Sequence, residues 1–213
     1  MSFPPPAPPY LGPAKHLSAG HNKPIHRIVI HSTDSPCVAG GARANAQWFN
    51  NPESKGSAHY IVDPEEVVQS VLDDGIAWHA PPNQHSIGVE MCDRPSKESL
   101  EHWMASPGEH PSGSKNPLRW LERNHRATLV KAARLTAELA LAYDVPVRFL
   151  GVKQLLAGER GITTHANVSN AWHQSTHWDP GIWPRRIFMR QVRKEVNALR
   201  LAAESPASVP VER

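Results

Sequence analysis

Short apolar runs separated by polar turns dominate the first part of the chain. Residues 25–33 (IHRIVIHST) and 86–92 (SIGVEMC) are nearly continuous apolar runs, a pattern typical of strands buried on both faces of a sheet. Residues 57–63 (SAHYIVD) predict another strand, which residues 65–72 either continue or pair with as a hairpin. Residues 40–51 predict a helix that begins at a pair of glycines. We expect its apolar face to contain Ala44, Trp48 and Phe49.

Helical periodicity dominates the second part of the chain. Residues 119–144 carry a broad apolar face and predict the clearest helix, and residues 185–203 predict a final amphipathic helix rich in arginine. Between them, residues 145–151 form either a short strand or an extended connection, and residues 152–158 a brief helix. This order of elements predicts an α/β fold, in which a central mixed β-sheet is flanked by helices.

Proline and polar residues mark both ends of the chain and one internal segment. Residues 1–24 are rich in proline and glycine and predict an extended N-terminal arm. Residues 25–203 form the main domain, and residues 204–213 (ESPASVPVER) predict a C-terminal linker, so we expect one module of a longer protein. Residues 93–118 predict a polar loop around a short helical stretch at 99–104.

Composition narrows the class of protein without identifying it. The 213 residues suffice for one domain with a filled core, and a net charge of +3 is too small to indicate nucleic-acid binding. No apolar run approaches the ~18 residues of a membrane helix. The N-terminus lacks the pattern of a secretion signal, so we expect a protein kept in a cytoplasm until it is released. Cys37 and Cys92 are too few for a disulfide framework and are expected to be reduced, structural thiols.

Histidines and tryptophans gather in residues 164–181 (THANVSNAWHQSTHWDPG), a segment that closes on Asp-Pro-Gly. Hydrolytic zinc sites combine three protein ligands with one position left for water. His31, at the end of a predicted strand, could join His165 and Asp179 of this segment in a His-His-Asp set. Two alternatives remain: His31 bonds a backbone carbonyl and binds no metal, or Asp179 only forms a turn and His173 is the third ligand.

Two further side chains have chemistry that a hydrolase needs. Glu90 interrupts an apolar strand, where a carboxylate requires either a buried partner such as an arginine or a catalytic purpose. As a general base it would take the proton of the attacking water and pass it to the leaving amine. His177 stands two residues before Asp179, where it either stabilises the oxyanion of the intermediate or lies exposed outside the reaction.

Five short motifs occur in a characteristic order: IVIHST, SAHYIVD, AWHA, SIGVEM and the terminal HWDPG. In this order and spacing the chain resembles the zinc-dependent N-acetylmuramoyl-L-alanine amidases of the amidase-2 type, whose fold is shared with peptidoglycan recognition proteins. The similarity covers roughly residues 25–185. The tryptophan-rich AWHQSTHWDPG most resembles the amidase modules of phage endolysins, particularly those of mycobacteriophages.

The resemblance implies a role for each candidate residue. His31, His165 and Asp179 match the zinc ligands of the family, and Glu90 matches the carboxylate proposed as its general base. His177 stands where relatives often carry a lysine that is assigned to oxyanion stabilisation. This difference matters because an unperturbed histidine loses its charge at about pH 6.5, whereas a lysine keeps it.

The resemblance also implies a substrate and a setting. The expected reaction is hydrolysis of the amide between N-acetylmuramic acid and L-alanine in peptidoglycan, by a monomer with neither nucleic acid nor a membrane as partner. Trp78, His79 and Trp172 are expected to contact this substrate. An endolysin module is made in the host cytoplasm and acts on the cell wall after release. The alternatives are a peptidoglycan-binding module without activity and an intracellular amidase that recycles wall fragments.

Overall fold

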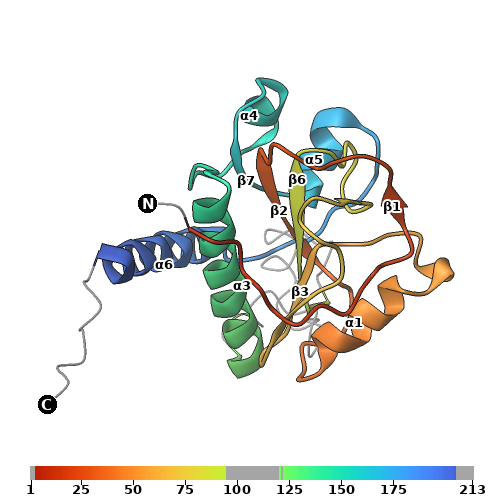
Figure 1. Ribbon diagram of the computed structural model, residues 1–213, viewed down its shortest axis with the longest axis horizontal. Coiled ribbons are helices and arrows are strands. Elements are labelled where there is room, and N and C mark those ends of the chain that lie inside the picture. Colours follow the sequence, from red (N-terminus) through yellow and green to blue (C-terminus); the bar gives the residue numbers. More distant parts are fainter. Residues whose placement is uncertain (1–2, 95–119, 121, 205–213) are drawn as a thin grey trace, which may run out of the picture.

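The computed structural model describes residues 3–94, 120 and 122–204 (Figure 1). A five-stranded sheet in the order β4-β3-β6-β2-β7 forms its centre. The strands are β2 (Arg27–Ser32), β3 (Tyr60–Val62), β4 (Val67–Gln69), β6 (Ser86–Met91) and β7 (Gly161–Thr164). All neighbours are parallel except β3 and β4, which form an antiparallel hairpin at one edge. A separate two-stranded sheet pairs β1 (Leu17–Ser18) with β5 (Ile76–Ala77).

Helices cover both faces of the sheet. The long helices α3 (Arg123–Ala142) and α6 (Arg185–Glu204) pack on one face, and α1 (Gly41–Phe49), α4 (Val152–Leu156) and α5 (His165–Trp172) lie on the other (Figure 1). Side chains of β2 alternate between these layers, because Ile28 and Ile30 pack with α3 whereas Val29 packs with α4 and α5. The predicted α/β class, with a mixed sheet flanked by helices, is confirmed.

The N-terminal arm packs along the β4 edge of the sheet. The carbonyl of Pro9 accepts a hydrogen bond from the amide of Gln69 at 2.9 Å, and the amide of Leu11 donates to the carbonyl of Gln69 at 2.7 Å. Further along the arm, the buried side chain of Asn22 brackets the backbone of Ser86, donating to its carbonyl at 2.6 Å and accepting from its amide at 3.2 Å. The arm therefore satisfies the backbone groups of an edge strand that would otherwise be open to pairing.

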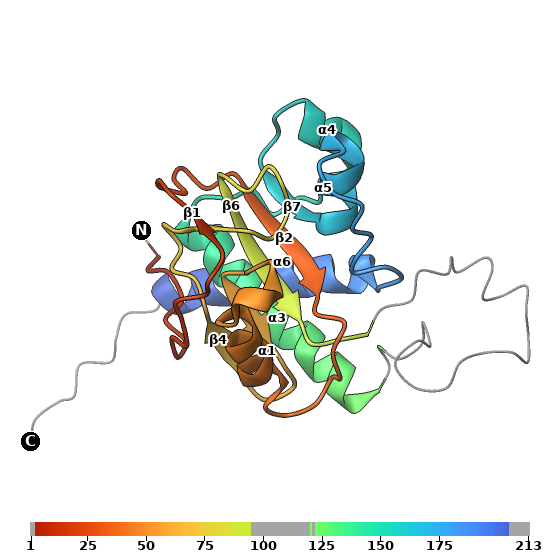
Figure 2. The ribbon, with the colours of Figure 1, turned by 90° about the vertical axis from the view of Figure 1, so that its right-hand side faces the viewer.

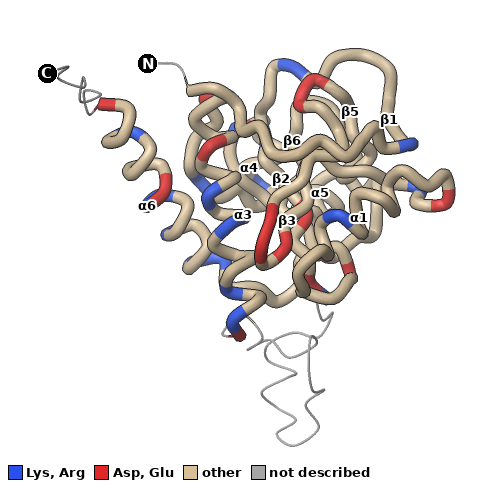
Figure 3. Tube along the Cα trace, turned by 60° about the horizontal axis from the view of Figure 1, so that its bottom comes forward, with Lys and Arg blue, Asp and Glu red and all other residues tan. Residues whose placement is uncertain are grey.

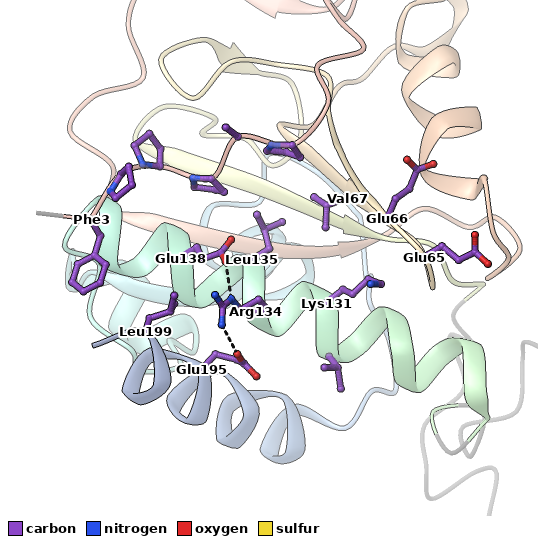
Figure 4. Close-up of a pocket in the computed structure, with 16 residues that line it drawn as sticks. Phe3, Glu65, Glu66, Val67, Lys131, Arg134, Leu135, Glu138, Glu195 and Leu199 are labelled. Atoms are coloured by element: carbon purple, nitrogen blue, oxygen red, sulfur yellow. Dashed lines mark hydrogen bonds and ion pairs between the residues drawn. The ribbon is translucent and has the colours of Figure 1, made fainter. Parts of the chain in front are cut away.

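Charged side chains join the two long helices beneath the start of the arm. Arg134 of α3 donates to Glu138 at 2.7 Å and to Glu195 of α6 at 3.0 Å, beside a cavity of about 740 Å³ that also touches Phe3 (Figure 4).

Over the described chain, Lys and Arg positions are interspersed with Asp and Glu positions (Figure 3). None of the helices in the described part of the chain is both long and apolar enough to cross a membrane.

Most predicted elements are present, the structure decides between the two alternatives for residues 65–72, and the face of α1 and two further elements differ from expectation. Residues 65–72 contribute the hairpin partner β4 and do not continue β3. The apolar face predicted for α1 was wrong at Ala44 and Trp48, which are exposed, and right at Phe49, which packs against the core beside the buried Ala42 and Ala46. Strand β7 and helix α5 were not predicted. The helical stretch expected at 99–104 lies outside the described residues, as does residue 205 onward of the expected linker.

Candidate metal centre and active-site cleft

Two predicted site residues lie side by side at the carboxyl ends of the parallel strands. The register of β2 and β6 pairs His31 with Glu90. Because Ile30 and Val89 face α3, the alternation of each strand turns His31 and Glu90 to the opposite face of the sheet. Figure 2 shows β2, β6 and β7 adjacent, with α5 beside them. The carboxyl edge of such a sheet is where α/β proteins commonly place their ligands.

The remaining metal-ligand candidates come from the segment that follows β7. His165 is the first residue of α5, whose start is capped by the Thr164 hydroxyl accepting a hydrogen bond from the amide of Asn167. Asp179 lies in the loop beyond α5. Its backbone carbonyl accepts a hydrogen bond from the amide of Ala166 at 3.0 Å, which holds this part of the loop against the start of the helix. A short strand, a cap and one backbone hydrogen bond thus bring His165 and Asp179 together.

His31, His165 and Asp179 converge on a common point. Each offers one ligand atom, and these atoms lie within 4.8 Å of one another. Nδ1 of His31 lies 3.1 Å from Oδ2 of Asp179, and Nδ1 of His165 lies 3.1 Å from Oδ1. Two donors bound ~2 Å from one tetrahedral zinc ion lie ~3.3 Å apart, so these spacings fit a shared ion. The alternative ligand His173 ends α5 in a left-handed conformation, is exposed, and is not part of this group.

The ring of His31 is neutral, and the second nitrogens of both imidazoles are engaged. Burial lowers the pKa of His31 to about 4, so the ring is in the uncharged form that metals bind. Nε2 of His31 lies 3.0 Å from Nδ1 of His79, and Nε2 of His165 lies 3.2 Å from the hydroxyl of Ser175. These contacts leave both Nδ1 atoms facing the common point. Sequence reasoning missed Ser175, which no motif distinguishes from the other serines.

Glu90 completes the centre with a carboxylate that no arginine of the described residues neutralises. Its Oε1 lies 3.8 Å from Nδ1 of His31, and its Oε2 is buried with no hydrogen-bond partner among the described residues. Burial, reinforced by the charge of Asp179, raises the pKa of Glu90 well above its ordinary value. An orphaned buried oxygen next to two imidazoles and a second carboxylate fits a site that holds a divalent cation and a water molecule.

His177 lies at the rim of the centre. Its ring stacks on that of His165 with centroids 4.4 Å apart, and its Nδ1 is 3.7 Å from Oδ1 of Asp179. Partial burial, followed by the neighbouring His165, lowers the pKa of His177. The side chain remains 66% exposed, so it faces the space above the three convergent residues and can meet a ligand there.

A cleft of about 500 Å³ opens above the centre. Trp78 is 44% exposed at its wall, whereas His79 also lines it but is only 6% exposed. Trp172 lies elsewhere: this last residue of α5 packs against the cluster that α4 and α5 form, with Arg27 over its ring, and the cleft lining does not include it. Trp48 was expected on the apolar face of α1 but lines the cleft, because the small side chains of Ala42 and Ala46 form the buried face of this helix.

Known proteins resemble this chain in sequence over part of its length. It is 34% identical to the N-acetylmuramoyl-L-alanine amidase XlyA of Bacillus subtilis over 71 residues, which are 31% of this chain and 24% of XlyA. It is 31% identical to the amidase CwlH of the same organism over 72 residues, which are 31% of this chain and 29% of CwlH. The chain thus matches less than a third of the length of either relative.

Solved structures share the fold at low sequence identity. The hydrolase AmiA of Staphylococcus aureus, solved with its ligand, superposes with a TM-score of 0.64 at 13% identity, covering 97% of this chain and 100% of AmiA. PlyL superposes with a TM-score of 0.53 at 14% identity, covering 88% of this chain and 97% of PlyL. The model of one protein family, described as N-acetylmuramoyl-L-alanine amidase, matches residues 21–182. That region contains the whole candidate centre and most of the chain, and the protein belongs to the amidase-2 family of N-acetylmuramoyl-L-alanine amidases.

Proposed function

We propose that this protein is a zinc-dependent hydrolase that cleaves the amide between N-acetylmuramic acid and L-alanine in bacterial peptidoglycan. The single observation that carries the proposal is the convergence of His31, His165 and Asp179 at the floor of an open cleft, inside the region that the family model matches. Two imidazoles and one carboxylate form a donor set typical of hydrolytic zinc sites. A module that only binds peptidoglycan has no need for three buried ligands of this kind.

The residues around the centre have the chemistry of amide hydrolysis. Zinc, when bound, polarises a carbonyl oxygen and lowers the pKa of water. Glu90 accepts the proton of the water whose oxygen attacks the amide carbon. As the C–N bond breaks, the same carboxyl gives that proton to the leaving amine of L-alanine, so that no proton is lost or gained. Its raised pKa suits both steps, because a carboxylate of ordinary pKa holds a proton too weakly.

The cleft supplies the remaining functions. His177 donates a hydrogen bond to the oxygen that becomes negative in the tetrahedral intermediate, a role that a neutral imidazole can also perform. Trp78 offers an exposed aromatic face on which a sugar ring or the lactyl group can pack. Trp172, which lies outside the cleft lining, has no part in this proposal.

The biological setting we propose is that of a phage endolysin module. The support is the AWHQSTHWDPG motif, which resembles such modules, together with the proline-rich arm. In this setting the protein acts as a monomer, is made in the host cytoplasm and reaches the cell wall after release.

The test combines metal analysis with release of amino groups from purified walls. We expect about one zinc per chain, loss of activity on removal of zinc by a chelator, and recovery on adding zinc back. His31→Ala should lose both metal and activity. The control is His173→Ala, which removes a histidine of residues 164–181 outside the centre and should keep both. Equal metal content in the His31→Ala variant would refute the proposed centre. Cleavage of soluble muropeptides but not of intact walls would indicate a recycling amidase. Binding to walls without release of amino groups would indicate a recognition module.

A further inference from the structure

A second layer of buried polar groups lies behind His31. His79 follows β5, and its ring stands between His31 and Ser86, with both contacts buried. Nδ1 of His79 lies 3.0 Å from Nε2 of His31, and Nε2 of His79 lies 3.0 Å from the hydroxyl oxygen of Ser86. This series of hydrogen bonds ends at the Ser86 hydroxyl, which donates to the backbone carbonyl of Asn83 at 2.6 Å.

The last bond sets the direction of every other one. A carbonyl can only accept, so the single hydroxyl proton of Ser86 points to Asn83. The Ser86 oxygen must then accept from Nε2–H of His79, which leaves Nδ1 of that neutral ring as an acceptor. His31 consequently donates through Nε2–H, and the lone pair on its Nδ1 then faces Oδ2 of Asp179, 3.1 Å away, with room for a cation that both atoms bind.

If all these hydrogen bonds ran in the opposite direction, the shortest of them, from Ser86 to Asn83, would be lost. If His31 were protonated at Nδ1, its Nε2 could only accept, and His79 would have to donate through Nδ1–H. The Ser86 hydroxyl would then donate to Nε2 of His79 and face the Asn83 carbonyl, 2.6 Å away, with no proton between two oxygens. Such a partly buried, unsatisfied contact is unfavourable. It opposes the hydrogen bond that an Nδ1–H group of His31 would donate to Oδ2 of Asp179 at 3.1 Å when no metal is bound.

The backbone around His79 holds its ring in this position. The side-chain oxygen of Asn83 accepts from the amides of His79 at 3.1 Å and Ala80 at 2.9 Å, which fixes the loop after β5. On the other side, Gly88 of β6 gives the ring its space, since a Cβ there would lie 2.8 Å from Cγ of His79. A ring confined by a loop and by a strand cannot turn to another partner.

We propose that His79 is a positioning residue that holds His31 in the Nε2–H form and so keeps the Nδ1 lone pair of His31 directed at the metal site. This role differs from the substrate contact that the sequence suggested, and it rests on the proposed function only for the identity of the metal. The hydrogen-bond partner of the second ring nitrogen decides which nitrogen of a histidine binds metal. In many metal sites a carboxylate or a carbonyl accepts the hydrogen bond from the second ring nitrogen of the ligand histidine. Here His79, held by Ser86, accepts that bond from His31.

The test uses the full chain and two readouts. The first is the tautomer of His31 in the metal-free protein, measured by long-range ¹H–¹⁵N spectra of ¹⁵N-histidine-labelled samples. The second is zinc affinity, measured by competition with a chromophoric chelator. The variants are His79→Leu, which removes both ring nitrogens, His79→Asn, whose side-chain oxygen can replace Nδ1, and Ser86→Ala. Thr136→Val, which removes a buried hydroxyl bond within α3, controls for loss of stability.

We expect a larger Nε2–H fraction of His31 in the unmodified protein than in Ser86→Ala, because without the Ser86 hydroxyl His79 can donate to His31 at no cost to the bond with Asn83. His79→Leu should bind zinc about 10–100-fold more weakly, the range typical of lost partners behind a ligand, and His79→Asn should recover most of that loss. Thr136→Val should bind zinc normally. The inference is overturned if His79→Leu binds zinc as tightly as the unmodified protein, or if Ser86→Ala leaves the Nε2–H fraction of His31 unchanged. Failure of the unmodified protein to bind zinc would instead overturn the proposed function, because the tautomer spectrum needs no metal.

Discussion

Replacing Glu90 by glutamine separates the proton-transfer chemistry of the centre from its architecture. The substitution preserves the volume of the side chain and removes its ability to accept a proton from water. Oε2 of Glu90 is buried and has no hydrogen-bond partner among the described residues, so the amide breaks no existing bond at that atom. A buried carboxylate without a counter-ion is also costly to the fold, and an uncharged amide is less so. We therefore expect the midpoint of urea unfolding to stay the same or to rise.

The expected loss of activity in Glu90→Gln is 10²–10⁴-fold in kcat, the usual contribution of a positioned general base. This corresponds to about 3–5 kcal/mol in the activation barrier. The assay is the rate at which new amino groups appear on purified walls, with zinc content and urea unfolding measured on the same samples. Glu195→Gln is the control, since that carboxylate contacts Arg134 of α3 and Gln191 of its own helix, away from the centre, and it should retain full activity. A Glu90→Gln variant that keeps its zinc and more than a tenth of the activity would show that another group carries the proton.

Three predictions concern the supports of the site. Asp63→Ala should lower the free energy of unfolding by about 3 kcal/mol in urea titrations, because Asp63 is fully buried and accepts three backbone N–H groups at the start of α1 and in the β3–β4 turn. Asn22→Ala should lower the same free energy by about 2–3 kcal/mol, because it leaves an amide and a carbonyl of β6 without their side-chain partner. Cys37 and Cys92, whose thiol pKa values burial raises to about 11 and about 12, should react with iodoacetamide at pH 8 at least ~100-fold more slowly in the folded than in the urea-unfolded protein. Since the unfolded thiols ionise at about pH 8.5, these two cysteines should also make the fold less stable as pH rises above that value.

The parts of the fold that sequence predicted well are those in which hydrophobic pattern alone decides the structure. β2 and β6 are continuous apolar runs because both faces of these strands are covered, and no other element of similar length satisfies that pattern. Glu90 was recognisable for the same reason, as a carboxylate that breaks such a run. The helix α3 was also clear, because a 20-residue segment gives its apolar face many turns in which to repeat.

The parts that sequence did not predict depend on contacts between distant segments. β7 has only four residues, and it is a strand because β2 lies beside it. Helix α5 (HANVSNAW) contains several residues of low helix propensity, so its cap and its packing against α4 determine its structure. His79 looked like a substrate contact because it adjoins Trp78, but burial behind His31 gives it different neighbours. A sequence window cannot register such neighbours, which belong to the folded sheet.

The arm illustrates why the boundary of a catalytic module is difficult to place from composition. Its proline content predicts an extended chain, and extended chains are usually dispensable. Here, however, the hydroxyl of Ser18 accepts a hydrogen bond from the indole N–H of Trp78 at 2.8 Å, which holds that ring at the cleft wall. Asn22 brackets Ser86, the residue whose hydroxyl directs the bonds from His79 to His31. Two residues near the C-terminal end of the arm thus support the site, one at the expected substrate surface and one behind a metal ligand, although the arm contains none of the reacting groups.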